Sequence, residues 1–216
     1  MDLVVPDHIA YCFGAGRPIF LDIARDRYFT VSEKLGDAFG AFVREDRDRG
    51  RGDEIDALVR HGLLAPSEAP LTTRRSPMPV RREIPSWASR RFHPGKAVAV
   101  ASAIWGAQRH LRRQPFAEVI ARLKRQRDDL QVGDAEQTRR SCADFLRHRS
   151  LVPIASVCLL DSLALLNVLQ ARGGQADLVF GVTASPFSAH CWVQLEDQVL
   201  NDHLDRVLAF TPILVV

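Results

Sequence analysis

The stretch from residue 156 to residue 174 constrains the fold of this chain more than any other. It reads S-V-C-L-L-D-S-L-A-L-L-N-V-L-Q-A-R-G-G, with leucine or valine on almost every side of the predicted helix. A helix with so few polar positions is stable only in the centre of a packed protein. Ser156 is the expected N-cap, and the double glycine at Gly173 and Gly174 is the expected stop.

Cys158 lies near the start of this helix. With Ser156 as the cap, Cys158 falls in the first turn, where free backbone N–H groups and the helix dipole favour a thiolate over a thiol. A helix that begins at Pro153, a favoured first position, would instead move Cys158 into the second turn and weaken this effect. The sequence is compatible with both starts, and the first predicts a nucleophilic cysteine.

Two strands are predicted after the double glycine, over residues 176–183 and 189–195. Both are rich in β-branched and aromatic residues, and a Ser-Pro-Phe-Ser loop separates them. Side chains alternate along the second strand, so His190 and Cys191 point to opposite faces. We therefore expect only one of these two neighbours to face Cys158, and we expect Cys191 to be a core residue.

The polar residues after the second strand predict a tight turn into the segment that ends at Asp202. A three-residue loop would place Asp202 across from His190, where a carboxylate can hold the imidazole in the tautomer that accepts a thiol proton. A two-residue loop would instead pair His203 with His190 and move Asp202 to the other face. Asp205 is then a second candidate for orienting the imidazole.

Cys158, His190 and Asp202 together suggest a catalytic triad. A lone cysteine on an apolar helix is usually an inert core residue, and a lone histidine on a strand is usually structural. Here the order, the spacing and the element types all agree with nucleophilic catalysis. Metal binding by Cys158, His190 and Cys191 would lack a fourth ligand, so we expect no metal and no cofactor.

The residues around this triad resemble those of the transglutaminase-like cysteine peptidases, and among them the lasso peptide biosynthesis B proteins. The likeness rests on the helix-borne Cys158, on F-S-A-H-C-W-V-Q-L-E-D from Phe187, similar to the family's F-x-A-H-A-W-V-E, and on V-L-N-D ending at Asp202. It covers residues 140–216. The resemblance implies that Cys158 is the nucleophile, His190 the base and Asp202 the orienting acid.

Two positions depart from the family pattern. Cys191 stands where a small inert residue is usual, and Gln194 stands where an acid is expected. The sequence also offers no side-chain donor just before Cys158 for an oxyanion hole, so backbone N–H groups at the helix start would have to serve.

Composition limits the remaining possibilities. The chain has 216 residues, of which 46% are hydrophobic and 25% charged, and its net charge is +3, so no nucleic-acid partner is indicated. No basic, apolar N-terminal signal or membrane-length apolar run is present, so we expect a cytoplasmic protein without a membrane partner. The four cysteines form no C-x-x-C pair, which disfavours a zinc ribbon, and Cys142 is expected to be a packed thiol.

The first part of the chain predicts a small winged-helix-like module. Alternating and β-branched residues favour a three-stranded antiparallel meander, and helical spacing of apolar residues follows, with Ser32 as a cap. The three predicted strands and two predicted helices are residues 8–13, 17–23, 27–31, 33–44 and 53–61.

This module resembles the peptide-recognition domain of ribosomal-peptide pathways, similar to the small chaperone of pyrroloquinoline-quinone maturation. The motif is I-F-L-D-I-A-R-D-R-Y-F-T-V from Ile19 to Val31, with R-H-G-L-L after it; the family normally has three helices after the sheet, whereas two are evident here. The resemblance implies that a leader peptide pairs as an added strand along one edge, with side chains in a groove against the second helix. The implied leader-binding residues are Tyr28, Phe29, Thr30, Val31 and Leu58. The alternative is that Tyr28 and Phe29 are ordinary strand residues.

A segment rich in proline and arginine follows, and three amphipathic helices come after it. Residues 67–95 have the composition of an extended linker. A nucleic-acid-binding arm is disfavoured, because neither preceding helix has a basic face. The three helices are predicted at residues 97–113, 115–127 and 135–148.

We therefore expect an α+β protein with a recognition domain at 1–66, a linker at 67–95 and a transglutaminase-like, papain-like cysteine peptidase domain at 96–216. The resemblance implies a cytoplasmic peptidase that binds the leader of a ribosomally made lasso peptide precursor and removes it. A separate ATP-dependent cyclase would then close the macrolactam. The alternatives are a leader-binding scaffold without catalysis, and an acyl transferase or amidase that uses the same triad on another substrate.

Overall fold

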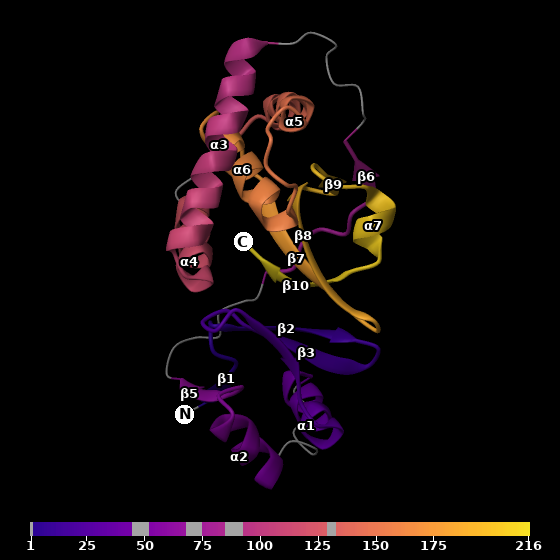
Figure 1. The fold of residues 1–216 in the computed structure, drawn as a ribbon. Coiled ribbons are helices and arrows are strands. Elements are labelled where there is room, and N and C mark those ends of the chain that lie inside the picture. Colours follow the sequence, from indigo (N-terminus) through magenta and orange to yellow (C-terminus); the bar gives the residue numbers. More distant parts are fainter. Residues whose placement is uncertain (1, 45–51, 68–74, 85–92, 129–132) are drawn as a thin grey trace.

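A three-stranded antiparallel sheet forms the centre of the N-terminal part, in a computed structural model that describes residues 2–44, 52–67, 75–84, 93–128 and 133–216 (Figure 1). The strand order is β2-β3-β4, which confirms the predicted meander and leaves β4 at an edge. The predicted helices follow, and an additional short strand pair, β1 with β5, was not predicted. These elements are β1 (Asp2–Val4), β2 (Ile9–Gly14), β3 (Arg17–Asp22), β4 (Arg27–Thr30), α1 (Glu33–Val43), α2 (Asp53–Arg60) and β5 (Ala65–Ser67).

The two faces of this sheet are covered by different parts of the chain. On one face the Phe20 ring lies 5.3 Å from Phe29 and 4.8 Å from Phe39 of α1, in a cluster that we call the N-terminal core. On the other face Ile19 and Leu21 belong to one buried cluster with the helices and strands of the C-terminal part. We call this second cluster the central core, because both parts of the chain contribute to it.

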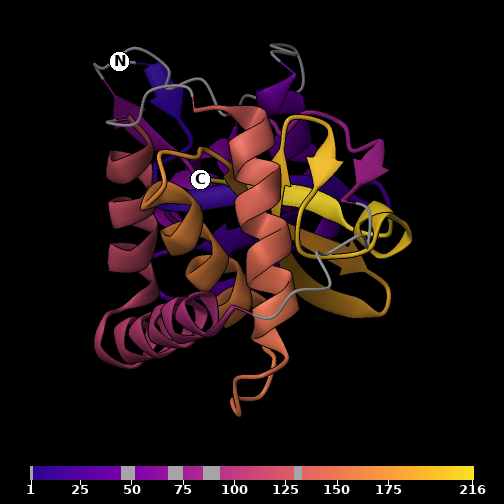
Figure 2. The ribbon, with the colours of Figure 1, turned by 90° about the horizontal axis from the view of Figure 1, so that it is seen from above.

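The C-terminal part is a five-stranded sheet with helices on one side. The strand order is β10-β7-β8-β9-β6. Seen from above, α3 to α6 lie together on one side of the strands and α7 lies away from them (Figure 2). The elements are β6 (Arg82–Glu83), α3 (Pro94–Arg113), α4 (Phe116–Asp128), α5 (Ala135–Arg149), α6 (Cys158–Gln170), β7 (Asp177–Ala184), β8 (Phe187–Leu195), β9 (Gln198–Val199), α7 (Leu204–Leu208) and β10 (Thr211–Val215).

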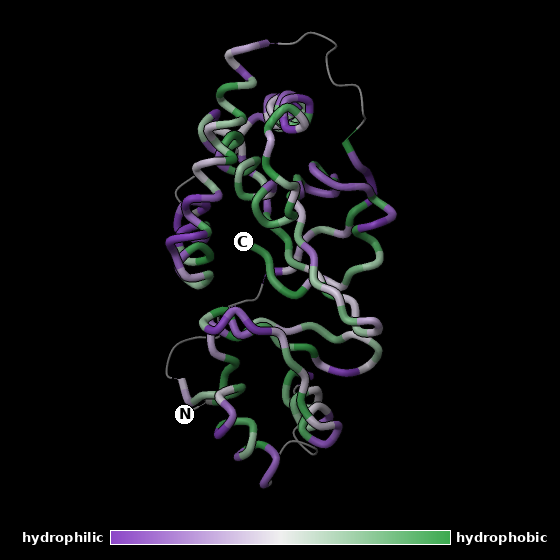
Figure 3. The backbone as a smooth tube through the Cα atoms, in the orientation of Figure 1, coloured by the Kyte–Doolittle hydropathy of each residue, from purple (hydrophilic) through white to green (hydrophobic). Residues whose placement is uncertain are grey.

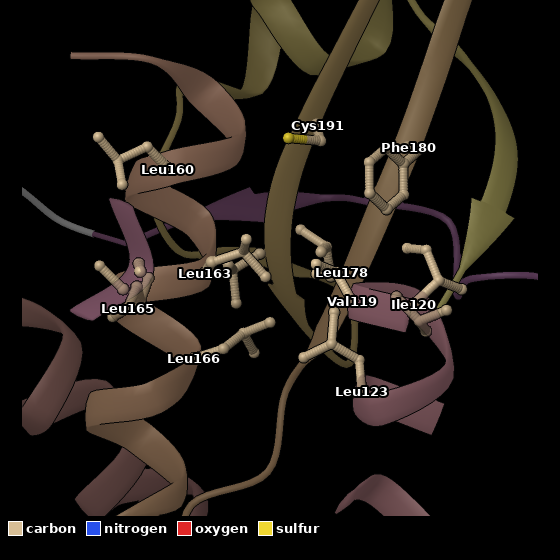
Figure 4. Packing of buried hydrophobic residues seen from close by; sticks show 14 of the residues in the cluster. Val119, Ile120, Leu123, Leu160, Leu163, Leu165, Leu166, Leu178, Phe180 and Cys191 are labelled. Carbon is tan, nitrogen blue, oxygen red and sulfur yellow. The ribbon is translucent and has the colours of Figure 1, made fainter. Parts of the chain in front are cut away.

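The apolar helix α6 is central, as its composition predicts. Leu163, Leu165 and Leu169 are at most 1% exposed, and they pack between α3, α5 and the sheet. Figure 3 shows hydrophobic residues along α6 and the facing strands, whereas hydrophilic residues gather around β6 and β9. Figure 4 shows Leu163 and Leu166 of α6 directed toward Leu178 of β7, whereas Leu165 points to the other side of the helix.

The described half of the proline- and arginine-rich segment lies against the sheet. Residues 75–84 include β6, which pairs in parallel with β9, and Arg82 forms an ion pair with Asp197. Val80 packs on the outer face of the sheet with Trp192. The arginine pair at 90 and 91 lies outside the described residues. Within the part of the chain that the structure describes, no helix has the length and apolarity needed to cross a membrane.

Candidate active site

The helix α6 begins at Cys158 itself. Val157 occupies the N-cap position, so neither Ser156 as cap nor a start at Pro153 is correct. The Cys158 N–H is therefore one of the N-terminal groups without an intrahelical acceptor, and its thiol lies in the first turn. This places the sulfur closer to the positive end of the helix dipole than a start at Pro153 would.

The loop that leads into α6 is fixed by a largely buried arginine, whose side chain is 13% exposed. Arg149 at the end of α5 donates from Nε to Asp161 of α6 at 2.6 Å, and to the carbonyls of Val152 at 3.3 Å and Ile154 at 3.0 Å. Ser156 donates from its hydroxyl to the same Asp161 carboxylate. The serine that was expected to cap the helix backbone therefore stabilises the helix start through Asp161 instead.

The turn between β8 and β9 has the two-residue form, with Gln194 paired to Val199. Continued in that register, the strand would turn Asp202 away from His190. The ladder ends at Val199, however, and the chain bends, so that Asp202 nevertheless forms a hydrogen-bonded ion pair with His190 Nε2. Asp205 lies in α7 and is exposed, so Asp202 and not Asp205 contacts the imidazole.

Cys158 approaches β8 at its open edge, and this corrects the expectation that only one neighbour faces it. The Val193 N–H points to the β9 side, where it donates to Asn201 Oδ1 at 2.7 Å. N–H groups two residues apart point the same way, so the Cys191 N–H also faces this edge, beyond the last residue of β9. Cys158 accepts hydrogen bonds there from the Cys191 backbone, from the Cys191 thiol and from His190. Side chains on opposite faces both reach the sulfur because it lies at the strand edge rather than over one face.

Electrostatics at this edge favour a thiolate paired with an imidazolium. Hydrogen bonds from Cys191 and then His190 lower the pKa of the Cys158 thiol from 9.0 to about 4, although partial burial opposes the shift. The hydrogen bond to Cys158, and next that to Asp202, raise the pKa of His190 above 6.5. With His190 Nε2 held by Asp202, Nδ1 is the ring nitrogen left for the sulfur. The ion pair therefore exists above about pH 4 and is lost as the pH rises through the raised pKa of His190.

Asp202→Asn is expected to shift the alkaline limit of this ion pair to lower pH. An amide removes the negative charge that favours imidazolium, so the pKa of His190 falls, whereas the acid limit set by Cys158 changes less. The rate of Cys158 alkylation by iodoacetamide, followed against pH by mass spectrometry, measures both limits without a substrate. Asp205→Asn is the matched control and should leave the profile unchanged; the opposite pattern would make Asp205 the orienting acid.

The imidazole is also held between two aromatic side chains. The ring centroid of His190 lies 6.3 Å from that of Trp192 and 5.2 Å from that of Phe210. Gly181 is the partner of His190 across the β7–β8 ladder. A Cβ at Gly181 would lie 2.8 Å from the Trp192 ring and 2.9 Å from Phe210 Cβ, so only glycine lets both aromatics close on the histidine.

Gly181→Ala is expected to lower both stability and activity. The added methyl group must displace Trp192 or Phe210, and overpacking of this kind costs about 1–3 kcal/mol. Displacement of these rings also loosens His190, so we expect Cys158 alkylation near neutral pH to slow by roughly a factor of a few beyond any unfolded fraction. Thermal unfolding and Cys158 alkylation measure the two effects. Gly106→Ala on α3, where a Cβ meets nothing within 4 Å, is the control.

The hydrogen bonds of Gln194 account for a glutamine where the family pattern has an acid. Its amide nitrogen donates to the carbonyls of Met78 at 2.5 Å and Glu196 at 2.7 Å, and its oxygen accepts from Trp192 Nε1 at 3.2 Å. A carboxylate has no hydrogen to donate to two carbonyls. Gln194 therefore ties the turn after β8 to the segment 75–84, through contacts that an acid at this position would not make.

Asn201 and Ser162 lie beside the candidate site, and no chemical pattern in the sequence pointed to them. Asn201 Nδ2 donates to Ser162 Oγ at 2.9 Å, while its Oδ1 accepts from the Val193 backbone. These bonds fix the chain where it bends toward Asp202. The one indication of a role for Asn201 was its position in the V-L-N-D segment, which is part of the likeness to the B proteins.

The proposed leader-binding residues lie on both faces of β4 and beyond it. Tyr28 faces the central core, and its ring centroid is 5.7 Å from that of Phe187 on β8. Phe29 and Val31 face the N-terminal core, and Thr30 is exposed. Leu58 is 0% exposed within the N-terminal core, so it supports this sheet from beneath.

Among the described residues, no group of three or more histidine, cysteine and acidic side chains is arranged to hold a metal ion.

Comparison with known proteins identifies the superfamily of the chain. A model of the transglutaminase-like superfamily matches residues 101–215, which is more than half of the chain and includes the three candidate triad residues. The Microcin J25-processing protein McjB of Escherichia coli is 47% identical over 47 residues, which are 22% of this chain and 23% of that protein. The aligned stretch is thus less than a quarter of either chain, and no solved structure matches. On the family match, this chain belongs to the transglutaminase-like superfamily.

Proposed function

We propose that this protein is a lasso peptide biosynthesis B protein: a cysteine peptidase that binds the leader of a ribosomally made precursor peptide and cleaves it from the core. The hydrogen-bonded set of Cys158, His190 and Asp202 at the start of α6 is the observation that supports this most directly. The likeness to a microcin-processing protein supports the choice of a peptide precursor as substrate.

Each triad residue has a distinct part in the proposed reaction. The Cys158 thiolate attacks the scissile carbonyl carbon, and the C–N bond breaks as the His190 imidazolium gives its proton to the leaving amine. A water molecule, deprotonated by the now neutral imidazole, hydrolyses the thioester. Asp202 holds the imidazole in place throughout. The Cys158 N–H, at the start of the helix, is suited to stabilise the oxyanion.

For leader binding we propose the free edge of β4, in residues 1–66. The Ile23 N–H, just after β3, donates to the carbonyl of His8, just before β2, at 2.8 Å. The backbone groups of odd-numbered residues of β3 therefore bond to β2, and those of even-numbered residues bond to β4. Phe20 pairs with Phe29, which leaves the backbone groups of Tyr28 and Thr30 directed outward. An added strand can bond to these groups.

Tyr28 makes this edge a suitable approach to the triad. Its ring contacts Phe187, three residues before His190 on β8, and its phenol lies within electrostatic reach of Cys158. A leader strand paired with β4 would therefore run beside the nucleophile. The bound leader would raise the effective concentration of the scissile bond. The freed core peptide would pass to a separate ATP-dependent cyclase, which only the family resemblance suggests.

The test is incubation of the protein with the precursor peptide encoded beside its gene, followed by mass spectrometry. Cleavage at one bond, blocked when Cys158 has been alkylated, supports a leader peptidase. Leader binding without cleavage, with the cyclase and ATP also supplied, would leave a recognition scaffold. Turnover of small amides or esters without any need for residues 1–66 would favour an acyl transferase or amidase.

A further inference from the structure

The second thiol at the active site, Cys191, contacts the nucleophile directly. Cys191 is 3% exposed, and Figure 4 shows its sulfur pointing from β8 toward the N-terminal end of α6. Its thiol hydrogen-bonds to the Cys158 sulfur, and its backbone N–H donates to the same atom. The family resemblance assigns an inert small residue to this position and therefore no role.

We infer that Cys191 is a positioning residue that donates its S–H to the Cys158 thiolate and fixes the nucleophile at the open edge of β8. This rests on the proposed function, in that it assumes the Cys158 thiolate to be the attacking group.

The hydrogen bonds behind Cys191 have only one consistent direction. The Val193 N–H can only donate, so it fixes the oxygen of the Asn201 amide, and the amide NH₂ must then donate to Ser162. Ser162 thereby accepts one hydrogen bond and has its own hydroxyl hydrogen left for the Cys191 sulfur, with which it hydrogen-bonds. Cys191 in turn has its thiol hydrogen for Cys158. The chain of donors ends on the thiolate, where each bond polarises the next.

The protonation states agree with this direction. The hydrogen bond to Cys158, followed by burial, raises the pKa of the Cys191 thiol, so Cys191 stays protonated when Cys158 is ionised. The other titratable groups facing this pair are His190 on β8, Asp202 after β9 and Tyr28 on β4. Burial raises the pKa of Tyr28, which therefore remains a neutral phenol. His190 and Cys191 are thus the two side chains that stabilise the thiolate, one on each face of the strand.

The test measures Cys158 alkylation by iodoacetamide against pH in folded protein. In Cys191→Ala we expect the acid midpoint to rise by about one to two pH units, so that alkylation at pH 5 slows by about twofold to tenfold. Cys191→Ser keeps an O–H donor and should retain most of the wild-type profile. Ser162→Ala, one step further along the chain of donors, should shift the midpoint in the same direction by less.

Cys142→Ala is the matched control. Cys142 is equally buried, at 0% exposed, but its sulfur donates to the Leu200 carbonyl at 3.3 Å rather than to Cys158. It should leave the profile unchanged. An unshifted midpoint in folded Cys191→Ala would overturn the inference, as would an equal shift in Cys191→Ser. Alkylation needs no peptide, so its outcome is separate from that of the cleavage assay.

Discussion

Cys158→Ala is expected to abolish cleavage of the precursor, with a fall in rate of about 10⁴-fold or more. Without the sulfur no thioester can form, and His190 and Asp202 have no nucleophile to activate. Mass spectrometry of the precursor under single-turnover conditions gives the rate. Leader affinity, measured by fluorescence anisotropy, should remain within about twofold of wild type, since β4 and the triad are different elements.

Cys158→Ser and His190→Ala extend this experiment. The serine hydroxyl is not ionised near neutral pH, so the variant should be nearly as inactive as the alanine variant while keeping the site's shape. His190→Ala should reduce the rate by about 10³-fold or more. Precursor cleavage at an undiminished rate in Cys158→Ala would assign the peptidase activity to other residues and refute the triad.

Thr30→Pro is expected to weaken leader binding by about 10–100-fold, with little change in the rate at saturating precursor. Proline removes the outward N–H of an edge strand and places its ring where the added strand must lie. The ladder between β3 and β4 uses Phe29 and Arg27 instead, so the sheet should persist. The preceding residue is already extended, as proline requires.

Thr30→Ala separates backbone from side chain. It keeps the N–H, so leader affinity should stay near the wild-type value, and circular dichroism should be the same for both variants. If alanine weakens binding as much as proline does, the threonine side chain and not strand addition explains the affinity. If neither variant changes the affinity, the leader binds elsewhere on the protein.

Local patterns in the sequence predict the elements that build the centre of the fold. The apolar helix at Cys158 and the alternating strands around Phe20 carry their own signals, because burial imposes a period on the sequence. The strand β6 has no such signal: Arg82 and Glu83 form it because backbone N–H groups of this segment bond to the carbonyls of residues 197 and 199, which lie far along the chain. Likewise β10 contains Pro212 and a register shift, and its pairing with β7 depends on the rest of the sheet.

The three candidate triad residues could be named in order from the sequence, but their geometry could not. The expected Asp202 contact came from a three-residue loop, whereas the contact exists with a two-residue loop and a bend after Val199. The contact of Cys191 with Cys158 was missed for a related reason. Alternation along a strand predicts the face on which a side chain lies. It does not predict that β9 ends early and leaves the edge of β8 open to Cys158.

The N-terminal sheet has α1 and α2 beneath it and the central core above it, so neither of its faces is free. Ala10, Ile19 and Leu21 are at most 3% exposed because the C-terminal part covers them. Dividing the gene after residue 67 would therefore give two products, each with an apolar surface exposed to water. Both products would tend to self-associate unless they were produced together.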